Sequence, residues 1–166
     1  MPKIQSRLAR ALALATACLL SAVAIAGTTT TTFTSQISLT AACVINSASA
    51  LNFGTQGMLA ANVDQTSTIQ VQCTNTTPYT IGLDAGTGTG GTIAARKLTS
   101  GGNTVNYMLH SDAAHTTIWG NTVSTDTVAA TGTGSGQNFT VYGRVPPQAA
   151  PAPGNYTDTI TVTVMY

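Results

Sequence analysis

The sequence predicts an all-β domain built as a sandwich of two sheets. Short runs in which β-branched or aromatic residues alternate with polar ones recur at intervals of about ten residues. Glycine, proline and asparagine separate these runs, as turn residues do between strands. Downstream of Ala26, no stretch has the apolar spacing of an amphipathic helix. Short strands separated by turn residues are typical of a β-sandwich.

Residues 1–26 have the features of a secretory signal peptide. Lys3, Arg7 and Arg10 precede an apolar run, and Ala24-Ile25-Ala26 has the small-x-small form of a cleavage site. We therefore expect an exported protein whose mature chain begins at Gly27. A lipoprotein signal built on Cys18 is disfavoured, because the alanine at position 15 stands where such a signal prefers leucine.

The mature chain retains two cysteines, Cys43 and Cys73, each at the end of an apparent strand. In an exported protein this pair predicts one disulfide. Closing a loop of ~30 residues would add roughly 3 kcal/mol to stability, chiefly by restricting the unfolded chain. The alternative is a pair of buried thiols, which an oxidising compartment disfavours.

Five threonines follow Gly27, and the whole segment to the first cysteine has extended-backbone character. We expect its second half, Gln36–Ile45, to form the first strand and to point Ile37, Leu39 and Cys43 inward. The first half has no hairpin partner in the sequence. It is either a disordered tail or a strand donated to a neighbouring molecule.

The middle of the chain predicts a series of strands and loops. A Gly-rich stretch, Ala85–Thr92, lacks the lysine of a phosphate-binding loop and is expected to be a surface loop. A second Gly/Thr/Ser-rich loop is expected over Asn121–Gly136. The expected strands are Ala50–Gln56, Asn62–Thr74, Pro78–Leu83, a hairpin of Lys97–Thr99 with Thr104–His110, a short strand with Ile118 and Trp119, and Asn138–Val145.

The final stretch, Tyr156–Tyr166, follows a proline-rich connection that is unsuited to a sheet interior. It alternates Ile160, Val162, Val164 and Tyr166 with threonines, apart from Met165, which predicts a half-buried strand. Because no further strand follows it in the sequence, we expect an open sheet edge, which can recruit another chain.

Charge and motifs exclude several classes of function. Only Arg96, Lys97 and Arg144 remain against five aspartates after Ala26, and there is no glutamate, so the mature chain is slightly acidic. This composition offers no basic surface for nucleic acid or for a membrane. Scattered aspartates argue against a glycosidase, and no Gly-x-Ser-x-Gly motif is present. We expect no enzyme activity, no cofactor and no small-molecule substrate.

The sequence also contains a possible metal site and a possible sugar-binding tryptophan, and neither is the favoured interpretation. His110 and His115 with Asp112 could ligate a metal, but their spacing fits no standard zinc motif, so we expect no metal site. Trp119 is expected to pack in the core and not to serve as a sugar platform.

Six short sequence motifs resemble the spore coat protein U family, which contains subunits of archaic chaperone-usher pili. They occur in one order along the chain, together with a signal peptide and a cysteine pair. They cover nearly the whole mature chain. The motifs are Leu51-Asn52-Phe53-Gly54, Tyr107-Met108-Leu109, Ser111-Asp112-Ala113, Ile118-Trp119-Gly120, Phe139–Pro146 and Gly154–Asp158.

The resemblance implies an incomplete immunoglobulin-like β-sandwich of the pilin type, completed by a donor strand from another subunit. Residues 27–36 would be the N-terminal extension and residues 37–166 the domain. The donor would be roughly Thr28–Ile37. Its expected side chains in the groove are Phe33, Ser35 and Ile37, and the expected edge of the accepting groove consists of Ile160, Val162, Val164 and Tyr166.

The resemblance also implies partners and a location. A periplasmic chaperone, an outer-membrane usher and other pilin subunits would bind the chain on its way to a surface pilus. The implied function is that of a structural subunit supporting adhesion and biofilm formation. The alternative is a secreted or pilus-tip binding module, lectin-like, that does not form the shaft.

Overall fold

The computed structural model describes residues 26–166, and the chain divides after Ile37 into two units. The predicted signal peptide lies outside the described residues, apart from its last residue. Residues 26–37 contain no helix and no strand, and their side chains are exposed. The division of the mature chain into residues 27–36 and 37–166 stays a prediction.

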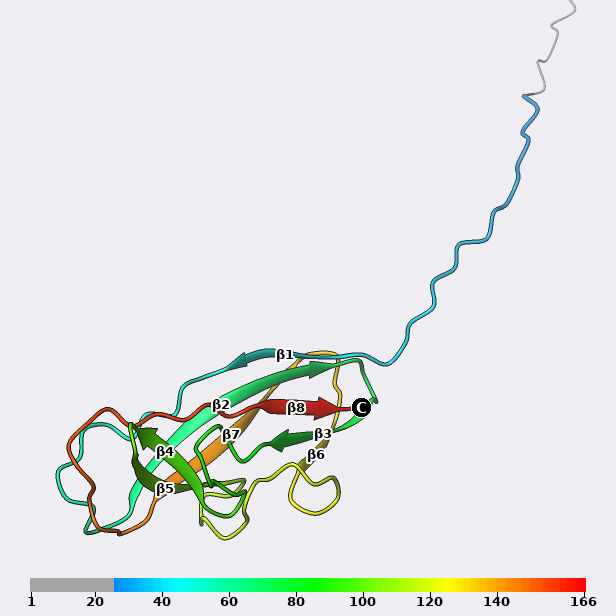
Figure 1. Cartoon of the computed structure of the whole chain (residues 1–166). Helices are drawn as coiled ribbons and strands as arrows, with labels where there is room; N and C mark the ends of the chain where they lie inside the picture. The colour runs from blue at the N-terminus through cyan, green and yellow to red at the C-terminus, as the bar shows by residue number, and fades with distance from the viewer. Residues whose placement is uncertain (1–25) are drawn as a thin grey trace, which may run out of the picture. The chain divides into compact units, whose positions relative to one another are not determined.

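Residues 38–166 form two antiparallel sheets (Figure 1). No helix within residues 26–166 has the length and hydrophobicity to cross a membrane. The first sheet has the strand order β1 (Cys43–Ala48), β2 (Val63–Cys73), β7 (Gly136–Val145), β5 (Asn103–His110) and β4 (Arg96–Ser100). The second has the order β6 (Val128–Thr131), β3 (Pro78–Leu83) and β8 (Val162–Met165).

One apolar core lies between the sheets, because alternate side chains of the strands point to the same side. Trp119 is 1% exposed, as expected from the sequence, and its indole Nε1 donates to the carbonyl oxygen of Ile81 at 2.8 Å. The other most buried apolar side chains come from four strands: Ile69, Val71 and Cys73 of β2, Tyr79, Ile81 and Leu83 of β3, Tyr107 and Leu109 of β5, and Val145 of β7.

Four sequence predictions are confirmed as strands or hairpins. The predicted strands Asn62–Thr74 and Asn138–Val145 correspond to β2 and β7, which pair along nearly their whole length. The predicted strand Pro78–Leu83 matches β3. The predicted hairpin corresponds to β4 and β5, which pair in register from Arg96↔Tyr107 to Ser100↔Asn103.

The prediction that Gln36–Ile45 forms the first strand is wrong for its first half. β1 begins at Cys43, and Ile37 and Leu39 are 82% and 85% exposed. The physical reason lies in the partner strand. β2 ends at Cys73, which is paired with Cys43, and residues before Cys43 therefore have no strand beside them.

Two other predicted strands are absent from the structure. Ala50–Gln56 is irregular, because the Asn52 side chain accepts a hydrogen bond from the Gly54 amide at 2.8 Å and Gly54 has a φ of 72°. The stretch bearing Ile118 and Trp119 makes only an isolated bridge, between His110 and Ile118.

The end of the chain also differs from the prediction. β6 lies inside the predicted loop Asn121–Gly136, where its Ala and Thr residues give no alternating pattern. The final strand is shorter than Tyr156–Tyr166 and covers only Val162–Met165. Before it, Thr157 pairs instead with Thr99 of β4, so the chain passes from one sheet to the other within this stretch.

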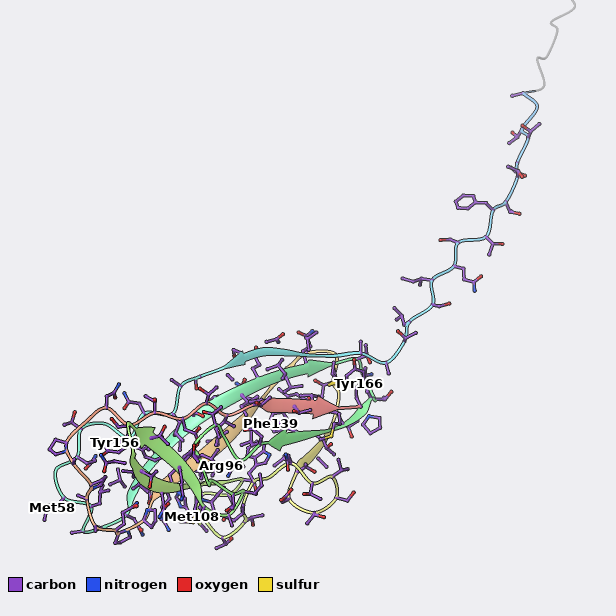
Figure 2. The ribbon with its side chains drawn as sticks, in the orientation of Figure 1. Met58, Arg96, Met108, Phe139, Tyr156 and Tyr166 are labelled. Atoms are coloured by element: carbon purple, nitrogen blue, oxygen red, sulfur yellow. A yellow bond between two sulfur atoms is a disulfide. The ribbon has the colours of Figure 1, made fainter. Side chains whose placement is uncertain are left out.

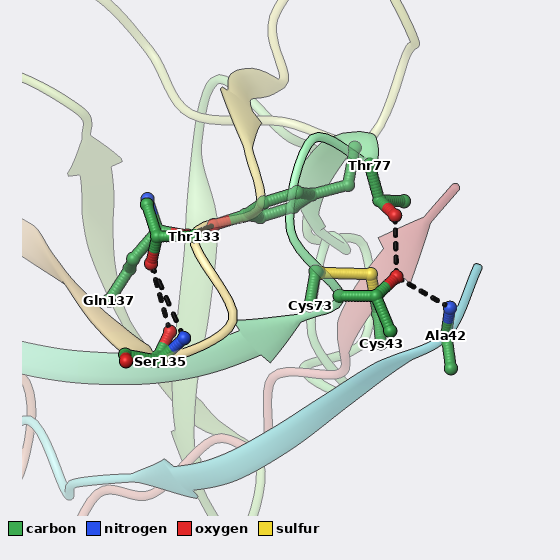
Figure 3. Close-up of a disulfide and its surroundings, with 9 residues drawn as sticks. Ala42, Cys43, Cys73, Thr77, Thr133, Ser135 and Gln137 are labelled. Carbon is green, nitrogen blue, oxygen red and sulfur yellow. Dashed lines mark hydrogen bonds between the residues drawn. A yellow bond between two sulfur atoms is a disulfide. The ribbon is translucent and has the colours of Figure 1, made fainter. Parts of the chain in front are cut away.

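The predicted disulfide between Cys43 and Cys73 is present (Figure 3). It lies where β1 begins and β2 ends. Beside it, the Thr74 hydroxyl accepts a hydrogen bond from the Ala42 amide at 3.2 Å and contacts the Thr77 hydroxyl at 2.6 Å. The disulfide therefore ties the first residue of β1 to the core strand β2.

Candidate functional site: an open flank between β1 and β8

Strands β1 and β8 lie at one flank of the sandwich, and each is the edge of a different sheet. Among the described strands, β1 pairs only with β2 and β8 pairs only with β3. Cα atoms of β1 and β8 approach within 8 Å, but no ladder joins these two strands. The sandwich is therefore open along this flank, which we call the open flank (Figure 1).

The backbone of β8 presents hydrogen-bonding groups to the open flank. Thr161, just before β8, directs its carbonyl oxygen toward β3, where it accepts a hydrogen bond from the Asp84 amide at 3.2 Å. Consecutive residues of a strand direct their N–H and C=O groups to opposite sides. Those of Val162 and Val164 therefore face away from β3, toward a side on which no described strand pairs with β8. An added strand could pair with them.

Core-facing side chains along the open flank are incompletely covered. Ile45 of β1 is paired with Val71 of β2, and cross-strand neighbours share one face of a sheet. Val71 is fully buried, whereas Ile45 is 41% exposed. Val162 and Val164 are half-buried and pack against the core. The core thus lacks a cover between the two strands.

The four residues predicted for the groove edge lie in and beside β8. Ile160 precedes the strand and is half-buried, and Val162 and Val164 belong to it. Tyr166 follows the strand and is 64% exposed (Figure 2). Whether these residues accept a donor strand stays a prediction.

A cavity of about 400 Å³ opens where β1 ends and β8 begins. Ala48 and Ser49 line one side of it, and Thr159 and Ile160 line the other. Its volume is about thirteen times the ~30 Å³ share of one water molecule in the liquid, so it has space for a large apolar side chain. Its floor is made of buried core side chains, namely Ile69, Leu83, Leu109 and Val141.

Asp158 holds the segment that leads into β8. Its Oδ1 accepts hydrogen bonds from the Thr87 amide at 2.7 Å and from the Gly88 amide at 3.1 Å. Its Oδ2 accepts one from the Tyr107 hydroxyl at 2.8 Å. Burial and this contact with Asp158 raise the pKa of Tyr107, which keeps the hydroxyl a donor. Asp158 thereby ties the Gly-rich loop and β5 to the start of the open flank.

Asp84 holds the same segment from the other side. Its Oδ1 accepts hydrogen bonds from the Thr161 amide at 2.9 Å and from the Gly86 amide at 3.0 Å. Burial alone would raise the pKa of Asp84, but the hydrogen bonds from Thr161 and Gly86 outweigh burial and lower it. Asp84 is therefore ionised at neutral pH and extends the pairing of β3 with β8 by one residue.

A second, larger cleft of about 860 Å³ adjoins the first cavity. It lies between the irregular segment after β1 and the proline-rich connection before β8, and Leu51, Phe53 and Asp158 line both hollows. Leu51 and Phe53 pack close to Gly143 of β7, where the Cβ of a larger residue would overlap Leu51. The two hollows therefore share part of their lining, and the larger one lies beyond the ends of β1 and β8.

The predicted donor residues lie outside the domain strands. Phe33, Ser35 and Ile37 belong to no helix or strand and are exposed, Phe33 to 91% and Ile37 to 82%. Two large apolar side chains in a segment without a partner are consistent with a donor role, which stays a prediction.

The candidate metal ligands of the sequence do not gather into a metal centre. His110 and His115 stack edge to face with ring centroids 5.1 Å apart. The Asp112 carboxylate instead closes its own turn by accepting from the amides of Thr116 and Thr117. Within residues 26–166, no three His, Cys, Asp or Glu side chains are placed to hold a metal ion.

Residues 29–163 match the family model described as the Spore Coat Protein U domain. The chain belongs to this family. A comparison with curated proteins found no match. The family match spans most of the exposed N-terminal segment and the sandwich as far as Thr163.

A solved structure shares the fold. A chain in the crystal structure of the CsuC–CsuE chaperone–tip adhesion subunit pre-assembly complex, from archaic chaperone-usher Csu pili of Acinetobacter baumannii, is 25% identical to this chain. The TM-score is 0.54, and the match covers 77% of this chain. This chain spans only 40% of the length of that one. The likeness supports the predicted incomplete immunoglobulin-like sandwich of the family.

Sequence reasoning did not find the two aspartates that hold the open flank. A signal for Asp158 was present, because it has the same parity as Ile160, Val162 and Val164, and residues of one parity in an extended segment share one face. A carboxylate at an inward position requires hydrogen-bond donors around it. Asp84 gave no such signal, since its partner Thr161 is distant in the sequence.

Proposed function

We propose that this chain is a structural subunit of a surface pilus assembled by the chaperone-usher route, and that a strand from another molecule completes its sandwich. The observation that carries the proposal is the open flank, where the unpaired edge of β8 borders a core left partly uncovered. Adding a strand there would pair the backbone of Val162 and Val164 and cover the exposed side of Ile45.

The energetics favour such an exchange. If a donor strand buries three or four apolar side chains, at ~25 cal/mol per Å² and ~100 Å² each, the gross gain is about 8 to 10 kcal/mol before the cost of ordering the strand. This gain is comparable with the net stability of a whole domain. An uncomplemented subunit is therefore marginal, and a complemented one is persistent.

The proposal assigns partners and a route. A periplasmic chaperone would first fill the open flank, and at an outer-membrane usher the segment Thr28–Ile37 of another subunit would replace it. Phe33 and Ile37 would occupy the flank, with Ser35 between them. The chain would thus be exported to the periplasm and reach the cell surface as part of a pilus that supports adhesion and biofilm formation.

Deleting Thr28–Phe33 tests the proposal. The deletion leaves the open flank intact, so chaperone binding should be preserved, while polymer growth should stop for want of a donor. Co-purification with the chaperone and electron microscopy of cells measure the two properties. Unimpaired fibres from the truncated protein would rule the proposal out.

A second candidate is a binding module at a pilus tip. The cleft of about 860 Å³ and the tip adhesion subunit named in the similar structure favour it. This candidate expects tight binding of the complemented monomer to a glycan array, with little binding after Tyr156→Ala in the cleft. If this chain were found along the whole length of the fibres, that result would favour the structural subunit instead.

A further inference from the structure

Leu39 is a large apolar side chain that the domain leaves uncovered. It is 85% exposed, lies before β1 and has no strand beside it. It has the same parity as Phe33, Ser35 and Ile37, so in an extended segment all four side chains point to one side. Residues 27–42 contain no Asp, Glu, Lys or Arg, so the segment can enter an apolar site without burying a charge.

The antiparallel pairing of all strands in this domain indicates the direction in which an added strand would run. Every strand pair in residues 38–166 is antiparallel, and antiparallel pairing is the more stable form per residue. A strand added antiparallel to β8 runs from Tyr166 back toward Ile160. The C-terminal end of the incoming segment then lies at the start of the β8 edge, beside the cavity of about 400 Å³.

The lengths of the two segments allow one register that brings Leu39 to the cavity. Phe33–Leu39 and Ile160–Tyr166 contain the same number of residues, and each spans about 20 Å when extended. Aligned antiparallel, Phe33 lies opposite Tyr166 and Leu39 lies opposite Ile160. Ile160 lines the cavity, whereas Tyr166 does not.

We propose that Leu39 of a second copy of this chain fills the cavity at the start of β8 and fixes the register of the donated strand. This inference rests on the proposed function and adds to it a residue beyond Thr28–Ile37. The apolar floor of Ile69, Leu83, Leu109 and Val141 suits a leucine side chain, and Asp158 in the same cavity disfavours a second carboxylate there.

Leu39→Asp tests the role of the side chain, and Thr40→Asp is its matched control. Thr40 is adjacent, exposed and of opposite parity, so its carboxylate would point out of the flank. Each variant is expressed as the full chain in cells that assemble the polymer, and both polymer and periplasmic monomer are quantified. Leu39→Asp should lower the polymer yield at least about tenfold, since a carboxylate would be buried unpaired, with monomer unchanged. Thr40→Asp should retain the yield.

Cross-linking tests the location. Chains with Leu39→Cys and chains with Ser49→Cys, which lines the cavity, are co-expressed, and the disulfide linking the two chains is identified by mass spectrometry. It should form in the polymer, and Thr40→Cys in place of Leu39→Cys should give none. Equal cross-linking by both would overturn the register.

The outcomes separate the two proposals. If Ile37→Asp abolishes the polymer and Leu39→Asp does not, strand donation stands and the role of Leu39 is wrong. If Ile37→Asp and Leu39→Asp both leave a normal polymer, the polymer forms by another route and both proposals fail. If the unsubstituted chain forms no polymer in its own cells, both fail as well.

Discussion

Arg96 is a fully buried cation that binds backbone carbonyls from three segments of the chain (Figure 2). Its Nε donates to the backbone carbonyl oxygen of Asp84 at 2.7 Å. Its Nη2 donates to the backbone carbonyl oxygens of Leu83 at 3.0 Å and Trp119 at 2.8 Å. Its Nη1 donates to Ile93 at 3.0 Å. Burial lowers the pKa of Arg96, but guanidinium stays charged in proteins. The side chain therefore satisfies carbonyls that the short strands leave unpaired.

Arg96→Met should lower the free energy of unfolding by about 3 to 5 kcal/mol, because methionine fills similar space but leaves several carbonyls without a donor. Urea denaturation of the mature chain measures the loss. The adjacent Lys97→Met is the control and should change stability by less than about 0.5 kcal/mol. A loss of equal size in both variants would contradict the role assigned to Arg96.

His110 should make stability depend on pH as the pH falls below about 6.5. It is 3% exposed, its Nδ1 has no hydrogen-bond partner, and it packs against His115. Burial lowers the pKa of His110. The unfolded chain therefore binds this proton first as pH falls through about 6.5, and stability declines until the lower folded pKa is reached.

The urea midpoint at pH 7.5 and pH 5 measures this effect. His110→Phe, which cannot be protonated, should flatten the dependence in this window. The aspartates with lowered pKa, Asp64, Asp84 and Asp112, lose their contributions only at lower pH, so they do not confound it. An unchanged slope in the variant would show that His110 is not the titrating group.

At the scale of the element, the open edge of β8 depends on side chains outside the strand. Asp158→Asn removes an acceptor oxygen for the Thr87 and Gly88 amides or for the Tyr107 hydroxyl. We expect about 1 to 3 kcal/mol lower stability and faster hydrogen exchange of the Thr163 amide in β8. Asp126→Asn is the control, because Asp126 closes a separate loop through Thr122. Equal effects on β8 exchange in both variants would contradict the assignment.

β1 depends on its single partner strand. Among the described strands it pairs only with β2, with an irregularity between Ile45 and Ser47, and the disulfide closes its first pair. Replacing both Cys43 and Cys73 by alanine should lower the free energy of unfolding by about 3 kcal/mol. Thermal unfolding of the oxidised protein and of the variant measures the difference, and the reduced wild-type chain should behave like the variant.

How accurately the sequence predicted an element depended on how many neighbouring strands that element has. Strands with two neighbours, such as β2 and β7, were predicted closely because alternate side chains of each are buried in the core between the two sheets. Several segments with one neighbouring strand or none were not. Ile37 and Leu39 have strand-like alternation but no partner in the domain, and β6 forms from residues without alternation because β3 lies beside it.

At the scale of the whole molecule, the domain should gain stability from a strand supplied in trans. A synthetic peptide of residues 28–42 added to the full mature chain, at about 100 times its dissociation constant, should stabilise it by about 2.7 kcal/mol. Differential scanning calorimetry measures the shift. A peptide with Phe33→Asp and Ile37→Asp is the control, and an equal shift with it would contradict pairing through the apolar face.

The sequence by itself determined the all-β class, the central strands and the cysteine pair, because period-two alternation and local turn chemistry are written in neighbouring residues. Only the tertiary structure decided which edges stay unpaired, where the cavity opens and which carboxylates hold it. Pairing and burial are set by residues far apart in the chain, such as Asp84 with Thr161 and Asp158 with Tyr107. An open flank is thus a property of the folded sandwich, and the pattern of a single segment does not contain it.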